Sequence, residues 1–297
     1  RAYGQAVGTA GGGDWHGAEL GSGALVRFGG NIQKSCVLMP KTDNQGVEWF
    51  SEEDLAQQKS CADELTFNSF VGRVGGLRLD TLHPSPEVQN ADYIFPEDKV
   101  IIELKTLETE IGNTDQFREK MTVVNRRLWK KYGKTPLSLD PEVSAAYLKA
   151  FIELHRAPIA RIVKKANAQI KSTKQNFGYD GYKGILLLIN DGFRELPPRL
   201  MLATLGRILN GSCSSIRAVI YLTNHYVVIP GDEYGRIIWV PSYADAEGDG
   251  IVDFVNRLGK AWFDFCEEIG QPSDDRQAGP DISIDGSRAA GSKFPIT

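Results

Sequence analysis

The sequence contains only four cysteines among 297 residues, and no two of them have the C-x-x-C spacing of a zinc site. Their scattered positions indicate reduced thiols, mostly in the core, rather than a disulfide framework. No apolar run approaches the roughly 18 residues that a membrane-spanning helix requires, and no secretory leader pattern is present. We therefore expect a cytoplasmic protein with no membrane segment.

Motifs of several common enzyme classes are also absent. The sequence has no G-x-S-x-G elbow of a serine hydrolase and no G-x-x-x-x-G-K-[ST] phosphate loop. The glycines near the start follow no strand and open no helix, which disfavours a dinucleotide site. His225 stands at the end of an expected strand without a nucleophile motif beside it. A structural role is therefore favoured for it over that of a general base.

The charge of the chain is low overall but unevenly distributed. The formal net charge is −4, yet residues 118–174 hold 14 Lys or Arg and only 4 Asp or Glu. Such a basic segment suits a surface that follows phosphate groups. A pair of solvated, lysine-rich helices would have the same composition, so charge alone leaves both interpretations open.

The pattern of apolar residues and turn signals predicts an α/β fold with a central mixed β-sheet and flanking helices, after a Gly-rich arm at 1–30. With 41% hydrophobic residues, the chain can form one large domain or two small ones. We expect strands at 36–39, 77–82, 90–95, 100–105, 184–189, 218–222, 226–229 and 236–240. We expect helices at 51–71, 117–131, 141–155, 158–175, 200–209 and 251–269, and a disordered tail at 271–297.

Three charged residues on two expected neighbouring strands carry the strongest functional signal. Asp92 lies on the first strand, and Glu103 and Lys105 lie on an apolar second strand, after a tight polar turn at Pro96–Lys99. Because side chains alternate along a strand, Glu103 and Lys105 share one face, roughly 6.6 Å apart. The hairpin brings Asp92 beside Glu103. Burying unpaired charge is costly, so a divalent cation is expected to neutralise the two carboxylates.

An E-x-K triplet alone is a weak signal, because one arises by chance about once in a chain of this length. Glu97–Lys99 also fits the pattern, but it follows Pro96 in a turn and is interpreted as solvated surface. Glu103–Lys105 differs because it lies within a Val-Ile-Ile strand and has an aspartate on the strand before it. The alternative is an edge strand with an exposed Glu/Lys face, since charged residues commonly protect sheet edges.

The pattern of Asp92 followed by Glu103-Leu104-Lys105 resembles the PD-(D/E)xK nuclease superfamily, with its restriction-endonuclease-like core. The resemblance is centred on residues 76–107, although Ala91 stands where the family has proline. It implies a nuclease domain at 31–270 with a helical insertion around 112–175. It also implies that Asp92 and Glu103 bind Mg²⁺, with Mn²⁺ as a substitute, and that Lys105 orients or deprotonates the attacking water.

The resemblance suggests further candidates. The Leu104 backbone carbonyl is a possible metal ligand, and Glu64 is an acidic residue on the first helix where family members often add one. Gln169 and Lys165 lie one turn apart on an expected helix, and some branches of the family place a glutamine beside the metal. Candidate contacts to nucleic acid are Lys165, Gln169, Lys171, Arg126, Arg127 and Lys130, all of which would equally suit an ordinary solvated surface.

These residues predict a magnesium-dependent nuclease, with DNA as the expected substrate and a prokaryotic role in restriction, antiviral defence or repair suggested by the family. Two alternatives stay open. One is a catalytically inactive nuclease-like fold that binds nucleic acid or protein, and the other is a structural subunit whose basic helices contact protein. DNA versus RNA, endo- versus exonuclease action, and a homo-oligomer or an activating partner also stay open.

Overall fold

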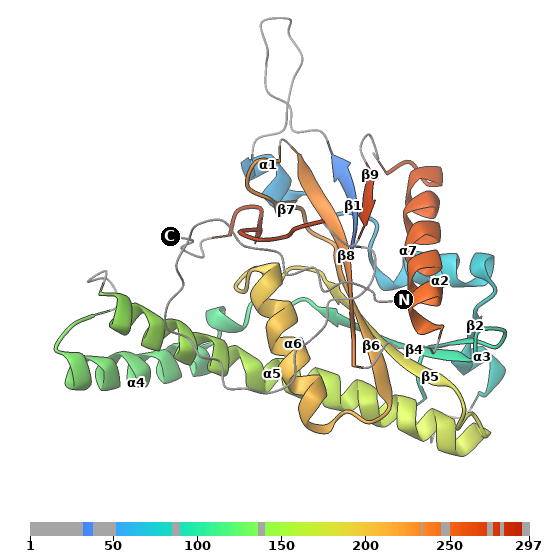
Figure 1. Cartoon of the computed structure of the whole chain (residues 1–297), viewed down its shortest axis with the longest axis horizontal. Coiled ribbons are helices and arrows are strands. Elements are labelled where there is room, and N and C mark those ends of the chain that lie inside the picture. Colours follow the sequence, from blue (N-terminus) through green and yellow to red (C-terminus); the bar gives the residue numbers. More distant parts are fainter. Residues whose placement is uncertain are drawn as a thin grey trace, which may run out of the picture.

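The structure is a computed structural model that describes residues 32–37, 52–84, 90–135, 140–232, 234–244, 250–271, 276–279 and 282–292. The predicted Gly-rich arm at 1–30 lies outside these residues. The described part of the chain forms one mixed β-sheet with helices on both faces (Figure 1). The predicted α/β class with a central mixed sheet is therefore confirmed.

Ten strands are seen in the described residues, and eight of them follow the order β10-β7-β8-β6-β5-β4-β3-β2. β4, β5 and β6 are parallel and the other pairs are antiparallel, with β1 joined to β8 and β9. The strands are β1 Ile32–Val37, β2 Leu77–Arg78, β3 Tyr93–Phe95, β4 Val100–Leu107, β5 Lys183–Asn190, β6 Ile216–Thr223, β7 Val227–Val228, β8 Gly235–Tyr243, β9 Arg276–Gly279 and β10 Arg288–Ala289.

Each face of the sheet packs against its own pair of helices. α2 and α7 cover one face, and α5 and α6 cover the other. The helices are α1 Glu52–Gln57, α2 Glu64–Val71, α3 Leu79–Leu82, α4 Asp115–Tyr132, α5 Pro141–Phe177, α6 Pro198–Ser212 and α7 Ile251–Glu268, with short 3-10 turns at Gly72–Val74 and Ile111–Asn113. No helix in the described ranges is both long enough and apolar enough to cross a bilayer.

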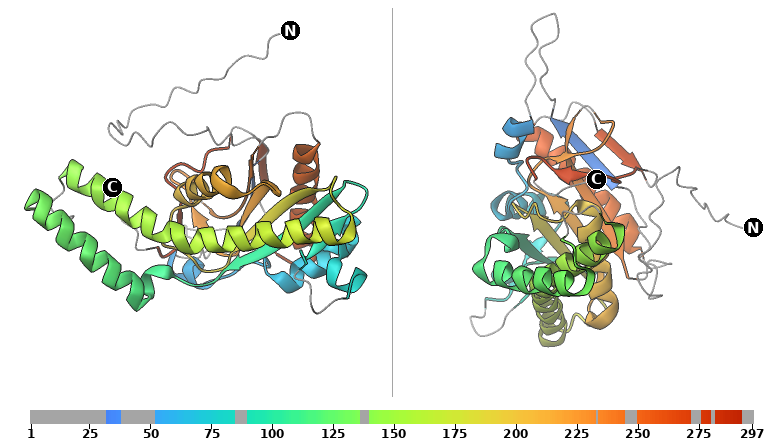
Figure 2. Two further views of the ribbon diagram at one scale, coloured as in Figure 1. Left: turned by 90° about the horizontal axis from the view of Figure 1, so that it is seen from below. Right: turned by 90° about the vertical axis from the view of Figure 1, so that its left-hand side faces the viewer.

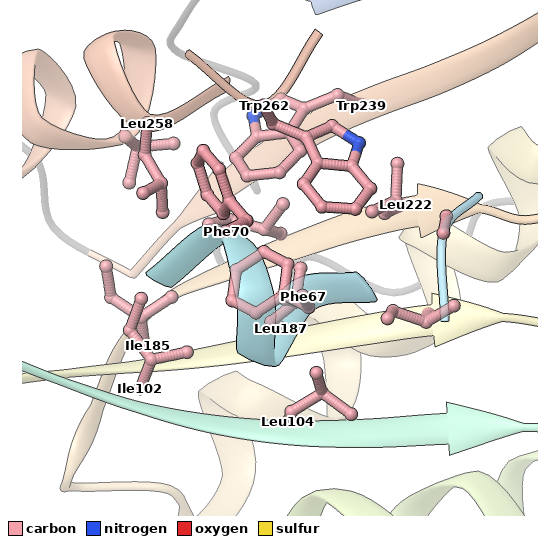
Figure 3. Close-up of a cluster of buried hydrophobic side chains, with 14 of the residues drawn as sticks. Phe67, Phe70, Ile102, Leu104, Ile185, Leu187, Leu222, Trp239, Leu258 and Trp262 are labelled. Carbon is pink, nitrogen blue, oxygen red and sulfur yellow. The ribbon is translucent and has the colours of Figure 1, made fainter. Parts of the chain in front are cut away.

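The core beneath α2 and α7 is rich in aromatic rings. Phe67 and Phe70 from α2 and Trp262 from α7 lie within 5.3 Å of one another, centroid to centroid (Figure 3). They rest on sheet residues such as Leu187, in the middle of β5. Burial of each such side chain contributes about 1.5–3 kcal/mol, so this cluster fixes α2 and the strands beneath it.

α4 and the first half of α5 form a helical arm, residues 115–132 and 141–154, that projects from the sheet (Figure 2). Phe117, Met121 and Leu128 form the buried side of α4, and the Phe117 ring packs 5.8 Å from that of Phe151 on α5. Gly133, with φ of 63°, ends α4 in the left-handed conformation that glycine adopts at little cost. The second half of α5 then covers β4 and β5.

Two predicted elements are shorter than the sequence suggested. The helix predicted at 51–71 is two helices, because Lys59 pairs with His225 in a β-bridge and Asp63 caps a new helix by accepting a hydrogen bond from Thr66 N. The strand predicted at 77–82 is only the two-residue β2, followed by α3. Leu77 and Leu82 are exposed, so their alternation did not reflect a half-buried strand.

Two other predicted boundaries were also wrong. The helices predicted at 141–155 and 158–175 are the single helix α5, which continues through Pro158 despite a cost of about 3 kcal/mol. Packing on α4 before the proline and on the sheet after it holds the helix together. The tail predicted to be disordered at 271–297 contributes β9, which pairs with β1, and β10, which pairs with β7.

Candidate active site

The β3–β4 hairpin brings the predicted acidic residues together. Tyr93 pairs with Ile102 and Phe95 with Val100, so Asp92 falls opposite Glu103 when this register is continued by one residue. The turn between the strands contains Glu97 and Lys99, and both are exposed. The interpretation of Glu97–Lys99 as surface is therefore confirmed, and the hairpin predicted for Asp92 and Glu103 is observed.

Glu103 and Lys105 lie on the sheet face that α5 and α6 cover. Ile101 and Leu107, at alternate positions of the same strand, belong to the core on that face. Ile102 and Leu104 belong to the opposite core, beneath α2 and α7 (Figure 3). The strand alternation inferred from the sequence is thus confirmed, and the two charged groups point away from the aromatic cluster.

Three side chains make direct contacts at this point. Asp92 Oδ2 accepts a hydrogen bond of 2.7 Å from the backbone N–H of Leu104. Lys105 Nζ donates to Glu103 Oε1 in a short ion pair. The Glu103 side chain is 0% exposed and that of Lys105 is 21% exposed, so the ammonium lies on the solvent side of the pair. When both acids are ionised, the single cation beside them leaves an excess negative charge.

Burial is the largest influence on both carboxyl groups. It raises the pKa of Asp92, although the hydrogen bond from Leu104 opposes the shift. Burial, followed by the nearby charge of Asp92, raises the pKa of Glu103 to about 8. Lys105 lowers both values but does not cancel the effect. The two carboxylates thus ionise fully only at alkaline pH or beside an added positive charge.

Helix α5 holds the segment that carries Asp92. Thr173 Oγ1 accepts a hydrogen bond of 2.7 Å from the backbone N–H of Ala91, and Gln169 Nε2 donates to the backbone carbonyl of Asn90 at 3.1 Å. Gln169 was a candidate from the sequence, and the structure brings it to the segment directly before Asp92. Asn90 was missed, although its position two residues before Asp92 would put both on one face of an extended chain.

Three buried oxygen atoms of Glu103 and of the residues that hold the segment before Asp92 lack a hydrogen-bond partner in the described part of the chain: Glu103 Oε2, Asn90 Oδ1 and Gln169 Oε1. Leaving such an acceptor unpaired costs about 1–3 kcal/mol. Hard oxygen acceptors with excess negative charge suit a small divalent cation and its bound water. We call Asn90, Asp92, Glu103, Lys105 and Gln169 the acid-pair site.

No group of three or more His, Cys, Asp or Glu side chains within the described ranges is placed to hold a metal ion. The acid-pair site offers two carboxylates, which is sufficient for Mg²⁺ because this ion commonly keeps several waters and takes one or two carboxylates. The Leu104 carbonyl is a further donor. In an extended strand the N–H and C=O of one residue point to the same side, so this carbonyl faces Asp92.

The remaining candidates lie around the site or away from it. Glu64, the first residue of α2, is exposed, and its charge contributes to the raised pKa of Asp92. Lys165 and Lys171 are exposed on α5, on either side of Gln169. Candidates on α4 belong to the helical arm and are not gathered at the acid-pair site (Figure 2): Arg126, Arg127 and Lys130.

A second buried polar group lies where β5 and β6 end. Asn190, Asp191, Asn224 and His225 form this strand-end network. Burial, and then the charge of Arg194, lowers the pKa of His225 to about 4, so its ring is neutral at pH 7. Its Nδ1 lies 3.2 Å from the Asn190 carbonyl. These contacts agree with the structural role expected for His225.

Comparisons with protein-family models, with curated proteins and with solved structures found no match. The chemistry of the acid-pair site is therefore the basis on which a function is assigned.

Proposed function

We propose that the protein is a magnesium-dependent nuclease that hydrolyses phosphodiester bonds in DNA, with Asp92, Glu103 and Lys105 as its catalytic residues. The observation that carries the proposal is a pair of adjacent carboxyl groups with raised pKa values, a buried Glu103 oxygen without a partner among the described residues, and one ammonium group at the solvent side. Such an arrangement is costly for stability alone, which favours a role in binding a cation.

The donors for a cation are the side chains of Asp92 and Glu103 and the carbonyl of Leu104. A bound Mg²⁺ supplies Lewis-acid polarisation of a phosphate and a water of lowered pKa. Asp92 is held in place by the hydrogen bond from Leu104 N, and α5 anchors the two residues before it. The carboxylate is thus positioned before any ligand arrives, which reduces the cost of assembling the site.

Lys105 has two tasks in this proposal. In the structure its ammonium offsets the charge on Glu103 Oε1. Because its side chain is partly exposed, the same group can reach a substrate phosphate, orient the attacking water and offset the charge that develops on the transferring phosphate. Gln169 and Asn90 have amide oxygens with no partner among the described residues, and these are suited to accept hydrogen bonds from water at the site.

The order of elements supports the same proposal. A helix, three antiparallel strands, crossover helices and a parallel strand occur in the order α2, β2, β3, β4, α4, α5 and β5, with the one-turn helix α3 between β2 and β3. This is the order expected from the resemblance to PD-(D/E)xK nucleases. The basic helical arm, which follows β4 after the 3-10 turn at Ile111–Asn113, favours a polyanionic substrate.

The test is cleavage of plasmid, linear and single-stranded DNA with Mg²⁺, with Mn²⁺ and with EDTA. We expect metal-dependent cleavage by the wild type and a loss of about a thousandfold or more in Asp92→Asn, Glu103→Gln and Lys105→Met. The turn triplet provides matched controls, because Glu97→Gln and Lys99→Met change the same residue types at exposed positions. Both controls should cleave at wild-type rates.

Calorimetric titration with Mg²⁺ and Mn²⁺ separates the nuclease from the inactive binding module. Metal binding that disappears in Glu103→Gln supports the proposal. Wild-type cleavage by Lys105→Met would contradict the assignment of Lys105. Failure of the wild type to bind metal, together with failure to cleave any of the three DNAs, would favour the inactive module.

A further inference from the structure

The tip of the helical arm carries a strongly basic surface. Between Lys120 and Thr135 the sequence has six Lys or Arg and no Asp or Glu. Of these, Lys134 pairs with Asp140, and Lys131 donates to the hydroxyl of Tyr132. The remaining cations of this stretch are exposed on α4: Lys120, Arg126, Arg127 and Lys130. A cluster of this kind attracts polyanions and repels basic surfaces.

An exposed aromatic ring lies within this basic surface. Trp129 is 56% exposed, and among the described residues it is the one aromatic side chain that is more than half exposed. It lies outside the packing side of α4, which Phe117, Met121 and Leu128 form. Arg126, three residues earlier, is its neighbour on the helix surface. A large ring left in solvent among cations does not contribute to the core and suits a flat ligand.

We propose that the helical arm binds unpaired nucleotides of the substrate, with a base stacked on Trp129 and the adjacent phosphates near Arg126 and Lys130. The inference rests on the nuclease function proposed above and names the class of its substrate. Positive charge selects a polyanion, and an exposed ring selects a ligand whose π faces are free. Single-stranded nucleic acid offers both in every nucleotide, whereas a duplex hides its base faces by stacking.

The arm and the acid-pair site are joined by one continuous helix, α5. α4 and α5 form an antiparallel hairpin, so the end of α4 that carries Trp129 lies near the start of α5. From Val143 to Gln169 the helix advances about 39 Å at 1.5 Å per residue. This length corresponds to about 11 base pairs of B-form DNA. A substrate held at both places therefore combines an unpaired segment on the arm with a scissile bond about one duplex turn away.

The test measures binding without chemistry, by fluorescence anisotropy in EDTA with single-stranded oligothymidine and with a blunt duplex. Trp129→Ala should weaken binding of the single strand about tenfold, because stacking on one aromatic ring contributes that much. Binding of the duplex should change less than about twofold. Trp129→Phe keeps a stacking surface and should retain most of the affinity. Arg126→Ala and Lys130→Ala should each reduce the salt dependence of single-strand binding by about 0.7 in the log–log slope.

The matched control is Val123→Ala, since Val123 is 53% exposed on the same helix. It should bind both DNAs as the wild type does, and thermal melting of each variant checks its folding. Single-strand binding that is unchanged in Trp129→Ala overturns the inference. Binding that is independent of salt also overturns it and marks the arm as a protein-contact surface.

The two proposals can fail separately. Trp129-dependent binding of single strands by a protein that never cleaves would support the arm and refute the nuclease function. Metal-dependent cleavage together with unchanged single-strand binding in Trp129→Ala would support the nuclease and refute the arm.

Discussion

The strand-end network and the acid-pair site are both groups of polar side chains at the sheet, but they use their hydrogen-bonding capacity differently. In the strand-end network, Asn190 Nδ2 donates to Phe193 O and to the hydroxyl of Tyr221, and its Oδ1 accepts from Phe193 N. Asp191 is paired with Lys59 and with Asn224. In the acid-pair site, acceptors of Asn90, Glu103 and Gln169 have no partner among the described residues.

Satisfied hydrogen bonds favour a structural role for the strand-end network, whereas unpaired acceptors favour a binding role for the acid-pair site. Ligands of α/β proteins usually bind at the carboxyl ends of parallel strands, which is where the strand-end network lies. Its polar groups, however, are already bonded to one another, so a ligand would have to break existing hydrogen bonds. The acid-pair site has buried acceptors without partners among the described residues, and it gains excess negative charge when both of its acids ionise. The hydrogen-bond inventory is therefore the reason for proposing a function at the acid-pair site rather than at the strand ends.

The comparison is tested most strongly by Asn190→Ala, which removes the centre of the strand-end network. The substitution leaves buried partners on Phe193 and Tyr221 without their bonds. We expect the free energy of unfolding to fall by about 3 kcal/mol, measured by urea denaturation. Asn176→Ala is the control, since Asn176 is exposed on α5 and its amide donates to the Ser172 hydroxyl one turn earlier. A change of less than about 1 kcal/mol in Asn190→Ala would contradict a structural role.

The pH dependence of stability tests the same network through His225. Its pKa is 6.5 in the unfolded chain and about 4 in the folded protein, so below pH 6.5 the unfolded state binds a proton that the folded state does not. Stability from this residue is thus present above pH 6.5 and is lost as the pH falls towards 4, by up to about 3 kcal/mol. Between pH 6.5 and pH 4, the free energy of unfolding should fall by about 3 kcal/mol less in His225→Gln than in the wild type, measured by urea denaturation at each pH. If the free energy of unfolding depends on pH equally in both proteins, the buried, neutral histidine is refuted.

The acid-pair site was largely predictable, because its main residues obey local rules. Alternation along β4 put Glu103 and Lys105 on one face, and the turn at Pro96–Lys99 put Asp92 opposite Glu103. The unpaired oxygens of Asn90 and Gln169 were not predictable in the same way. They depend on how α5 packs against the segment before β3, which is a contact between residues 79 positions apart.

The fold shows the same division between local and distant causes. The alternating or continuous apolar runs of β4, β5 and β6 predicted those strands. The split between α1 and α2 was missed because it depends on a bridge from Lys59 to His225, far along the chain. The sequence predicted two helices in place of α5, separated at Pro158. The local penalty of proline is visible in the sequence, whereas the tertiary packing that overrides it is not.

At the acid-pair site, the stability of the metal-free protein should change with pH in the opposite sense to the His225 effect: it should fall as the pH rises. The folded pKa of Glu103 is about 8, above its unfolded value of 4.5, so the wild type loses stability as the pH rises from 4.5 through 8. Glu103→Gln lacks this loss. In EDTA, its stability relative to the wild type should increase by up to about 5 kcal/mol over that range. Glu97→Gln removes an exposed carboxylate from the hairpin turn and serves as the control.

Chemical denaturation across this pH range measures the effect, and added Mg²⁺ should stabilise the wild type but not Glu103→Gln. A relative stability that stays constant with pH would mean that Glu103 is not held in a site that disfavours its charge.

The smallest effect is expected from Glu64, whose position tests how many carboxylates the site uses. Glu64 is exposed, and its charge reaches Asp92 without forming a third member of a metal-binding group in the described residues. Glu64→Gln should therefore weaken Mg²⁺ binding only about threefold at low salt, as expected for a nearby surface charge. High salt should remove the difference, because it screens exposed charges. Calorimetric titration at both salt concentrations measures this. A loss above about tenfold that persists in high salt would make Glu64 a direct ligand and the site a three-carboxylate centre.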